Sequence, residues 1–547
     1  MMIFLKLLLI SSGLMFISEA ASIHNESSLC YQPSKYIKPI HYDIKLISCI
    51  EGHIFYGEYN ISISILNKTQ QIFLQSEKLS IKDIVLFTNV KKYHEYDKDT
   101  VYKLTYNIVE DTINISLIAE LSPGNYILNI KYHGIADEVF RIYDVKGKIA
   151  WVADIHFHII CTRQRFSCWD EQNLLLKTTF NISVGCNQCT ALSNMPLQNV
   201  EENEYKVLWT HFATTSAMSP YLVTMIVSNF LSRIDYDNQN IQMWCNNEYE
   251  FHMKFAKNFA ENITLLLKNK WNLRSKQILN VTHIAIPNFH DNGIIDIGLV
   301  FYKETDIIYD KNLYPISHKI EVAQLIGRKV IEEWFNIPLN SLLMSNFLIK
   351  RGFNALFAMY AVNMSYPDSR IGNLFVVQNQ HYSFNLDDYL WNWYYYMGNS
   401  TLKVHGLLEI PNSIRATFML RMMEHLFTGG TLQKLMSSYH ELSHRLSSVG
   451  LELNVTESLN QYMHYEIPRI KDWALQKRCP LIRVERGYND SRGQTLLRIQ
   501  YTRTDKIKLR DIPLTFTTET SPNFDNFITQ FLSVSQISNY HLKRMVG

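Results

Sequence analysis

Two hydrophobic periods divide the chain. From about residue 35 to residue 230, apolar side chains recur mostly at every second position, as at Tyr59, Ile61, Ile63 and Ile65, between turns rich in Gly and Asn. Alternation of this kind is typical of strands with one buried face. The pattern predicts a large N-terminal β domain over residues 31–231.

The second period is helical. From about residue 262 onward, apolar residues fall three or four positions apart, as at Val322, Ile326 and Val330 and again between Leu432 and Leu446. This spacing is typical of amphipathic helices that bury one face. It predicts a mainly helical domain over residues 232–468.

Alternation returns after Trp473. It covers residues 481–486, 495–502 and 512–517, and it predicts a second, smaller β domain over residues 469–547 whose completeness the sequence leaves open. The fold class is therefore α+β with several domains.

The composition fits a folded extracellular protein. The chain has 547 residues, of which 47% are hydrophobic and 19% charged, so it is long enough for about three domains and too hydrophobic for a disordered chain. Its formal net charge is +2, and no long basic run stands out. We expect no nucleic-acid partner.

The first twenty residues have the pattern of a secretory leader. Lys6 precedes an apolar run, and the small residues Ser18 and Ala20 follow at the spacing of a cleavage site. The run is shorter than the roughly 20 residues that span a bilayer, and no later segment is long and apolar enough to span one. We expect a cleaved signal peptide at residues 1–20 and secretion. The alternative is an uncleaved anchor that holds the protein at the cell surface.

Potential modification sites support the same compartment. N-x-Ser/Thr sequons, which predict N-glycosylation in a secreted protein, occur at Asn25, Asn60, Asn67, Asn114, Asn181, Asn262, Asn280, Asn363, Asn399, Asn454 and Asn489.

Eight cysteines follow the leader, an even number that favours disulfides in an oxidising compartment. Eight cysteines allow 105 connectivities. The economical pairs are the local ones: Cys30 with Cys49, Cys161 with Cys168, and Cys186 with Cys189.

Several ordered segments resemble the zinc aminopeptidases of the aminopeptidase N type, a gluzincin metallopeptidase family. They include Pro39-x-His41-Tyr42-Asp43, the turn 166–171 (FSCWDE) and the stretches 177–184 (KTTFNISV), 191–196 (ALSNMP), 218–230 (MSPYLVTMIVSNF) and 512–518 (IPLTFTT). The resemblance spans roughly residues 35–518. It implies an N-terminal β domain, a thermolysin-like catalytic domain and a small β sandwich. The family's C-terminal helical domain finds no counterpart in this sequence.

The zinc-binding positions of that family are altered here. Its H-E-x-x-H-x-W motif, anchored on Trp334, aligns Arg328 and Glu332 with the two His ligands and Lys329 with the catalytic Glu. The third ligand, nineteen residues beyond the second His, falls on Arg351. Arginine cannot deprotonate to bind Zn²⁺. We therefore expect the family's cofactor, zinc, to be absent.

Three further positions of the family are also altered. By ungapped alignment, Ile295 stands where a Glu holds the substrate amino group and His156 where a Gln assists it. Asn412 is the closest match to the transition-state Tyr, and no Tyr lies between Leu407 and Arg421. Because the ligands, the base and the substrate clamp are all replaced, we expect no peptidase activity.

A charged cluster is predicted in place of the metal. Arg328 and Glu332 are i, i+4 neighbours on one helix, and Arg351 is expected to approach from the next helix. We expect an Arg-Glu-Arg cluster at the former zinc position.

A literal H-E-x-x-H motif occurs elsewhere, at His440-Glu441-Leu442-Ser443-His444. The apolar stripe of that helix centres on Leu442, with both His residues turned away toward solvent. No Glu stands nineteen residues beyond His444, where the chain has Met463. We interpret the motif as part of a surface helix.

The sequence thus favours a non-catalytic homologue that acts as a secreted or cell-surface binding or structural glycoprotein for an unknown peptide or protein ligand. Its old cleft could accept an extended peptide by strand addition. The alternative is an active zinc aminopeptidase with a relocated site at His440 and His444. A truncated or poorly expressed product is a third interpretation.

Overall fold

The computed structural model describes the N-terminal and central parts of the chain with gaps and the C-terminal part as strands alone. The described residues are 36–49, 54–88, 101–109, 111–135, 140–145, 148–155, 166–169, 178–187, 189–218, 220, 223–234, 241–269, 281–287, 289, 294–296, 298–335, 344–377, 381, 417, 420–421, 481–489, 494–502, 511–516, 528–533 and 538–543.

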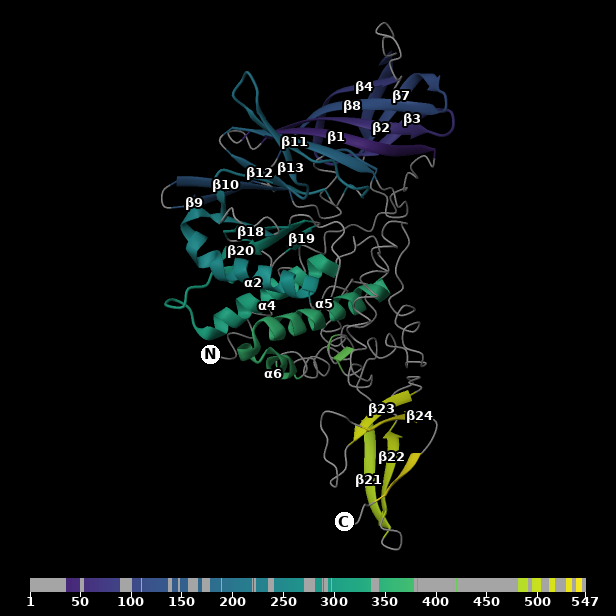
Figure 1. Ribbon diagram of the computed structural model, residues 1–547. Helices are drawn as coiled ribbons and strands as arrows, with labels where there is room; N and C mark the ends of the chain where they lie inside the picture. Colours follow the sequence, from purple (N-terminus) through teal and green to yellow (C-terminus); the bar gives the residue numbers. More distant parts are fainter. Residues whose placement is uncertain are drawn as a thin grey trace, which may run out of the picture.

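An eight-stranded sheet dominates the N-terminal part (Figure 1). Its strands run in the order β13-β14-β11-β1-β2-β8-β4-β5. Their bounds are β1 (Ile37–Cys49), β2 (Ile54–Ile65), β4 (Leu79–Thr88), β5 (Val101–Tyr102), β8 (Gly124–Ile135), β11 (Thr179–Cys186), β13 (Leu197–Glu202) and β14 (Leu208–Phe212). In β2 every second side chain is buried, as the alternation predicts, so the sheet has one core face and one outer face.

A three-stranded sheet, β3-β7-β6, contributes to the same hydrophobic core. Its strands are β3 (Thr69–Gln75), β6 (Leu104–Val109) and β7 (Thr112–Leu121). Aromatic rings fill the core: Tyr42 stacks on Phe180 with ring centroids 5.1 Å apart, and Tyr59 meets Phe166 edge-on at 6.2 Å. Burial raises the pKa of the Tyr59 hydroxyl, which accepts a hydrogen bond from the Ser167 backbone nitrogen. The predicted N-terminal β architecture is confirmed.

A four-stranded sheet, β12-β15-β10-β9, lies between that sheet and the central part of the molecule (Figure 1). Its strands are β9 (Phe140–Val145), β10 (Lys148–Ile155), β12 (Thr190–Ser193) and β15 (Met225–Ser228).

The central part opens with a five-stranded sheet, β16-β17-β18-β20-β19, that the helical period did not predict. Its strands are β16 (Leu231–Ile234), β17 (Ile241–Asn246), β18 (Val281–Ile286), β19 (Ile294–Asp296) and β20 (Leu299–Lys303). All six side chains of β18 are buried, and β18 pairs in parallel with both β17 and β20. A parallel strand covered on both faces is a continuous apolar run without alternation, so the expectation of a mainly helical stretch was incomplete here.

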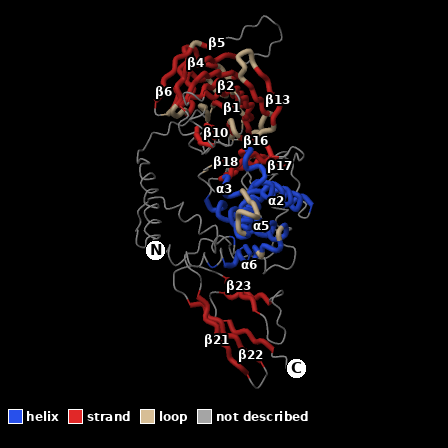
Figure 2. The backbone as a smooth tube through the Cα atoms, turned by 90° about the vertical axis from the view of Figure 1, so that its left-hand side faces the viewer, coloured by secondary structure: helices blue, strands red, loops and turns tan. Residues whose placement is uncertain are grey.

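Helices make up the rest of the central part that the structure describes (Figure 2). The helical elements are η4 (Asn247–Tyr249), α2 (Glu250–Asn269), α3 (Glu304–Ile307), α4 (Ile316–Phe335), α5 (Met344–Ser365), η5 (Pro367–Ser369) and α6 (Ile371–Phe375). The predicted helix through Val322 and Val330 is confirmed as α4, which packs against α2 and α5. Among the described helices, none has the length and apolarity needed to cross a membrane.

Gly327 permits the close packing of α4 on α5. A Cβ at Gly327 would lie 2.4 Å from Cγ2 of Val362, so a larger residue would push the two helices apart.

Strands form in the C-terminal part, after Trp473, where the alternation of apolar residues predicts them. A three-stranded sheet β21-β22-β25 and a two-stranded sheet β23-β24 form there (Figure 1). Their bounds are β21 (Leu481–Asn489), β22 (Gln494–Thr502), β23 (Asp511–Phe516), β24 (Ile528–Ser533) and β25 (Ser538–Lys543).

Candidate functional site

Helix α4 carries three of the positions that the sequence aligns with a zinc site. Arg328 and Glu332 lie one turn apart on its more accessible face, where Arg328 is exposed and Glu332 half-buried. Lys329 is 8% exposed and lies next to the core residue Val330. The helix therefore presents one cation to solvent and keeps a second at the edge of its core.

Lys329 and Glu332 form an ion pair. The Lys329 Nζ donates a hydrogen bond to Oε2 of Glu332 at 2.8 Å, with the two side chains 11% and 24% exposed. The sequence predicted Arg328 and Arg351 as the partners of Glu332. The partner among the described side chains is instead Lys329, at i, i+3 spacing, because its long stem lies along the helix and brings the ammonium to the carboxylate.

Glu333 joins α4 to the strand segment that aligns with the family's substrate clamp. This carboxylate is 5% exposed, and its Oε1 accepts a hydrogen bond from the Gly298 backbone nitrogen at 3.0 Å. Gly298 forms the turn between β19 and β20, and β19 carries Ile295 and contacts α4. The fold therefore brings the aligned clamp strand and the aligned zinc helix together, through a carboxylate that the sequence did not single out.

The Gly298 turn requires glycine. Its φ is +78°, in the left-handed region, and a Cβ there would lie 2.9 Å from the carbonyl oxygen of Asn194. Any other residue would meet both backbone strain and a steric clash. The turn thus fixes the distance between the β12 segment, β19 and α4.

A buried aromatic pair lies beneath this helix. His283 Nδ1 is 2.9 Å from the Tyr302 hydroxyl, and the two rings stack with centroids 5.7 Å apart. Burial lowers the pKa of His283 to about 4, so the imidazole is neutral at physiological pH. Burial, and then the nearby carboxylates of Glu332 and Glu333, raise the pKa of Tyr302.

Sequence reasoning missed His283, although a signal exists. A histidine inside the apolar run 281–286 is expected to be buried. A buried imidazole has to be neutral or has to form hydrogen bonds that offset its burial. His283 and Glu333 also line a small cavity of about 20 Å³ together with Trp334 and Thr264, a volume near that of one water molecule.

The remaining predicted site residues are only partly placed. Arg351 lies on α5, and its side chain is outside the described residues, as is that of Ile295 on β19. His156, Asn412, His440 and His444 lie outside the described residues altogether. Over the described part of the chain, no three His, Cys, Asp or Glu side chains are grouped so that they could hold a metal ion.

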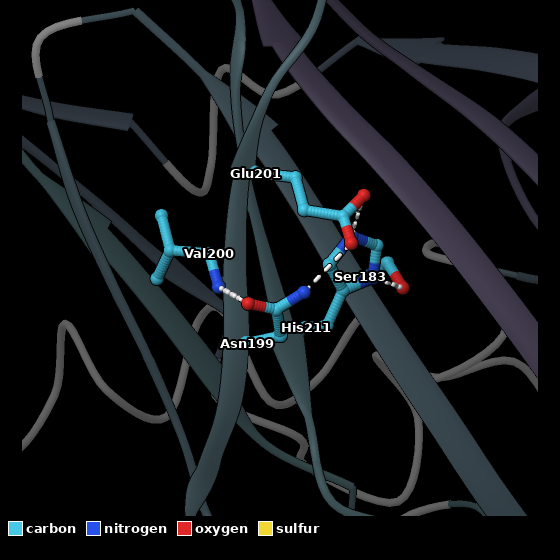
Figure 3. Close-up of polar contacts among 5 residues, drawn as sticks. All are labelled: Ser183, Asn199, Val200, Glu201 and His211. Carbon is cyan, nitrogen blue, oxygen red and sulfur yellow. Dashed lines mark hydrogen bonds and ion pairs between the residues drawn. The ribbon is translucent and has the colours of Figure 1, made fainter.

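A second polar array lies on the outer face of the eight-stranded sheet (Figure 3). Ser183 Oγ is 2.8 Å from Nδ1 of His211, and Nε2 of His211 is 3.9 Å from Oε2 of Glu201. Asn199 Nδ2 donates to Oε1 of Glu201 at 2.6 Å.

This array resembles a Ser-His-Glu arrangement only in composition. Ser183 is 6% exposed, so its oxygen is hardly accessible to a substrate carbonyl. His211 also stacks on Trp209, with an interplanar angle of 19°. We interpret the array as cross-strand polar pairing on the sheet face, not as a nucleophile with its base.

The cysteines and sequons are placed in part. The expected Cys186–Cys189 disulfide is present, and Cys245 is a buried free thiol. Cys30 and Cys161, each expected to pair locally, lie outside the described residues.

Six sequon asparagines have described side chains: Asn67, Asn262 and Asn363 are exposed, and Asn60, Asn114 and Asn181 half-buried. Asn489 lies on β21, and Asn25, Asn280, Asn399 and Asn454 lie outside the described residues.

Comparison with known proteins agrees with this architecture. Residues 38–222 match the family model of the Peptidase M1 N-terminal domain. Aminopeptidase A of Gloydius brevicauda is 25% identical over 362 residues, which are 64% of this chain and 37% of that protein. Aminopeptidase M1-A of Oryza sativa subsp. japonica is 23% identical over 464 residues, 82% of this chain and 51% of that protein.

Endoplasmic reticulum aminopeptidase 2 of Homo sapiens is 25% identical over 353 residues, 62% of this chain and 36% of that protein. The chain thus spans about a third to a half of the length of these relatives. The domain match and the named relatives, together with the fold of the N-terminal sheets, support this chain as a member of the M1 aminopeptidase family.

Proposed function

We propose that this chain is a non-catalytic homologue of the zinc aminopeptidases and acts as a secreted or cell-surface binding glycoprotein. The observation that carries the proposal is the ion pair between Lys329 and Glu332 on α4. It involves the position aligned with the catalytic base and the position aligned with the second His ligand.

The donor chemistry of these residues does not fit a zinc ion. A zinc ligand must offer a lone pair, and an ammonium such as that of Lys329 offers none. Oε2 of Glu332 accepts the Lys329 hydrogen bond, so the one carboxylate at an aligned ligand position is already engaged by a cation. Arg328 adds a second cationic group that offers no lone pair to a metal ion.

The missing base supports the same conclusion. A side chain that acts as a general base, taking a proton from water, must be deprotonated near neutral pH. Lys329 donates a hydrogen bond to Glu332 at 2.8 Å, so the side chain at the aligned base position acts as a donor and not as a proton acceptor.

The ligand class that fits this scaffold is an extended peptide. Among the described strands, β19 is one of the two edge strands of the five-stranded sheet, and it lies next to α4. An edge strand binds a peptide through backbone groups and needs no metal. Without a Glu at Ile295, we expect binding without selectivity for a free N-terminus.

The test measures zinc and turnover on the full chain expressed with its own leader in a secretory host. We expect less than about a tenth of a zinc ion per chain and no hydrolysis of aminoacyl anilides. The zinc measurement discriminates because a catalytic site would retain its zinc through purification. Stoichiometric zinc with turnover abolished by His440→Ala would overturn the proposal and support the relocated site.

A gain-of-binding variant provides the matched control. Arg328→His, Lys329→Glu, Glu332→His and Arg351→Glu together rebuild the three zinc ligands and the catalytic Glu of the family. We expect this variant to bind about one zinc ion per chain while the parent binds none. Zinc in the parent that the four substitutions leave unchanged would show that the metal lies elsewhere and would contradict the proposal.

A further inference from the structure

The outer face of the eight-stranded sheet is open and polar. On its four central strands the core-facing side chains are almost fully buried, as for Ile44, Ile61, Ile130 and Ile182. The alternate side chains point to the opposite face. There Lys131 Nζ lies 3.7 Å from Oε1 of Glu58, and the two side chains are 52% and 44% exposed.

Two sequon asparagines lie in one row across this face. Asp43 on β1 is directly opposite Asn181 on β11 and also directly opposite Asn60 on β2. Neighbouring strands are about 4.8 Å apart, so the two asparagines are roughly 10 Å from each other. Figure 1 shows the strands that carry them, β11 and β2, on either side of β1 in the upper part of the molecule.

Both amides are held with the nitrogen available. Oδ1 of Asn60 accepts a hydrogen bond from Asn129 Nδ2 at 2.8 Å, and Oδ1 of Asn181 accepts one from Thr214 Oγ1 at 2.6 Å. Among the described residues, neither Nδ2 donates to a protein acceptor. Nδ2 is the atom that carries an N-linked glycan.

The surface beside Asn181 suits a sugar ring. Trp209 lies across Gly185, where a Cβ would be only 3.1 Å from the indole Cε2, and it stacks with His211, whose Nδ1 contacts Ser183 of the same sequon. Figure 3 shows His211 bridging Ser183 and Glu201 across this surface. Aromatic faces carry partial negative charge and attract the C–H groups of a pyranose.

We propose that Asn60 and Asn181 both carry N-linked glycans, and that the two glycans cover the outer face of the eight-stranded sheet. In this modification Nδ2 forms a bond to the anomeric carbon of a lipid-linked oligosaccharide diphosphate. The bond from that carbon to the diphosphate oxygen breaks, the lipid diphosphate leaves, and Nδ2 loses one proton. The protein ligand of the proposed function therefore binds elsewhere on the molecule.

The first experiment is glycopeptide mass spectrometry on the secreted full chain. We expect glycan on the peptides containing Asn60 and Asn181, and the loss of one glycan from each of the variants Asn60→Gln and Asn181→Gln. Asn125→Gln is the matched control, because Asn125 is an exposed asparagine on β8, opposite Ser64 of β2, without a sequon, and it should lose no glycan.

The second experiment measures whether the glycan at Asn181 shields Trp209 from solvent. Hydroxyl-radical oxidation of Trp209 should rise in Asn181→Gln relative to the parent and to Asn125→Gln, since removal of the glycan uncovers the ring. Unchanged oxidation of Trp209, or an unmodified Asn60 or Asn181 in the secreted parent, would overturn the inference. Glycan occupancy at Asn60 and Asn181 in the parent protein tests the inference even if a variant is not secreted.

The inference rests on the secretory route of the proposed function, and the two failures are distinguishable. Asn67 and Asn262 are exposed sequons away from this face. Glycan at those two positions with none at Asn60 and Asn181 would overturn the inference alone. No glycan at any sequon would overturn secretion itself.

Discussion

Glu333 on α4 accepts a hydrogen bond from the backbone nitrogen of Gly298, 35 residues earlier in the chain. The contact joins the helix aligned with the zinc site to the turn that follows the aligned clamp strand. The geometry around the aligned zinc and clamp positions is thus held in part by a contact within the protein.

Gly298→Ala tests that turn. The φ of +78° and the 2.9 Å approach to the Asn194 carbonyl predict a loss of about 2 kcal/mol or more in the free energy of unfolding. Urea unfolding followed by tryptophan fluorescence measures it. Gly372→Ala is the control, because a Cβ at Gly372 meets nothing within 4 Å and should be neutral or slightly stabilising. Equal midpoints for both variants would contradict the prediction.

Glu332→Ala tests the ion pair. Removal of the carboxylate 2.8 Å from the buried Lys329 ammonium should lower the free energy of unfolding by ~2–3 kcal/mol, since a buried charge loses its partner. Glu321→Ala on the same helix is the control: its side chain is 70% exposed, 3.4 Å from His318, and its loss should cost less than ~1 kcal/mol.

The double variant Lys329→Met/Glu332→Leu separates charge from packing. It removes both charges and keeps apolar volume, so its stability should return to within about 1 kcal/mol of the parent. A cost for Glu332→Ala no larger than that for Glu321→Ala would show that the pair contributes little.

Glu304 and His283 should give opposite pH dependence. Burial, and then the charge of Glu248, raise the pKa of Glu304 from 4.5 to about 7, and Glu304 Oε2 is buried without a hydrogen bond among the described residues. The folded state therefore keeps a proton that the unfolded chain releases. Stability from this group is present below pH 4.5 and is lost as the pH rises to about 7, by up to ~3 kcal/mol.

His283 has the reverse sign. Its pKa falls from 6.5 to about 4 on burial, so the folded state binds the proton less tightly than the unfolded chain. Stability from His283 is present above pH 6.5 and is lost as the pH falls to about 4, again by up to ~3 kcal/mol. Between pH 4.5 and 6.5 the two effects oppose each other in the parent protein.

Single variants separate these two contributions. Glu304→Gln should gain stability relative to the parent as the pH rises from 4.5 to 7, and His283→Asn should gain as the pH falls from 6.5 to 4. Urea midpoints at half-unit pH steps measure both differences. A difference that does not change with pH would show that the group titrates alike in the folded and unfolded states.

Much of the fold was predictable from local patterns. Alternation predicted β2 with its buried face and the strands β21 and β22, and helical spacing predicted α4 through Val322 and Val330. The five-stranded sheet was missed, because a strand such as β18, buried on both faces, leaves no period of two in the sequence.

The sequence by itself determined the family resemblance, the residues at the positions aligned with the zinc ligands, and the positions of the sequons, since these depend only on which residue stands at which place. The tertiary structure alone decided the contacts. It pairs Glu332 with Lys329 in place of Arg328, brings Gly298 to Glu333, and aligns Asn60 with Asn181 through Asp43. The physical reason is that side-chain reach, turn geometry and strand register join residues far apart in the chain, and no local pattern records which pairs will meet.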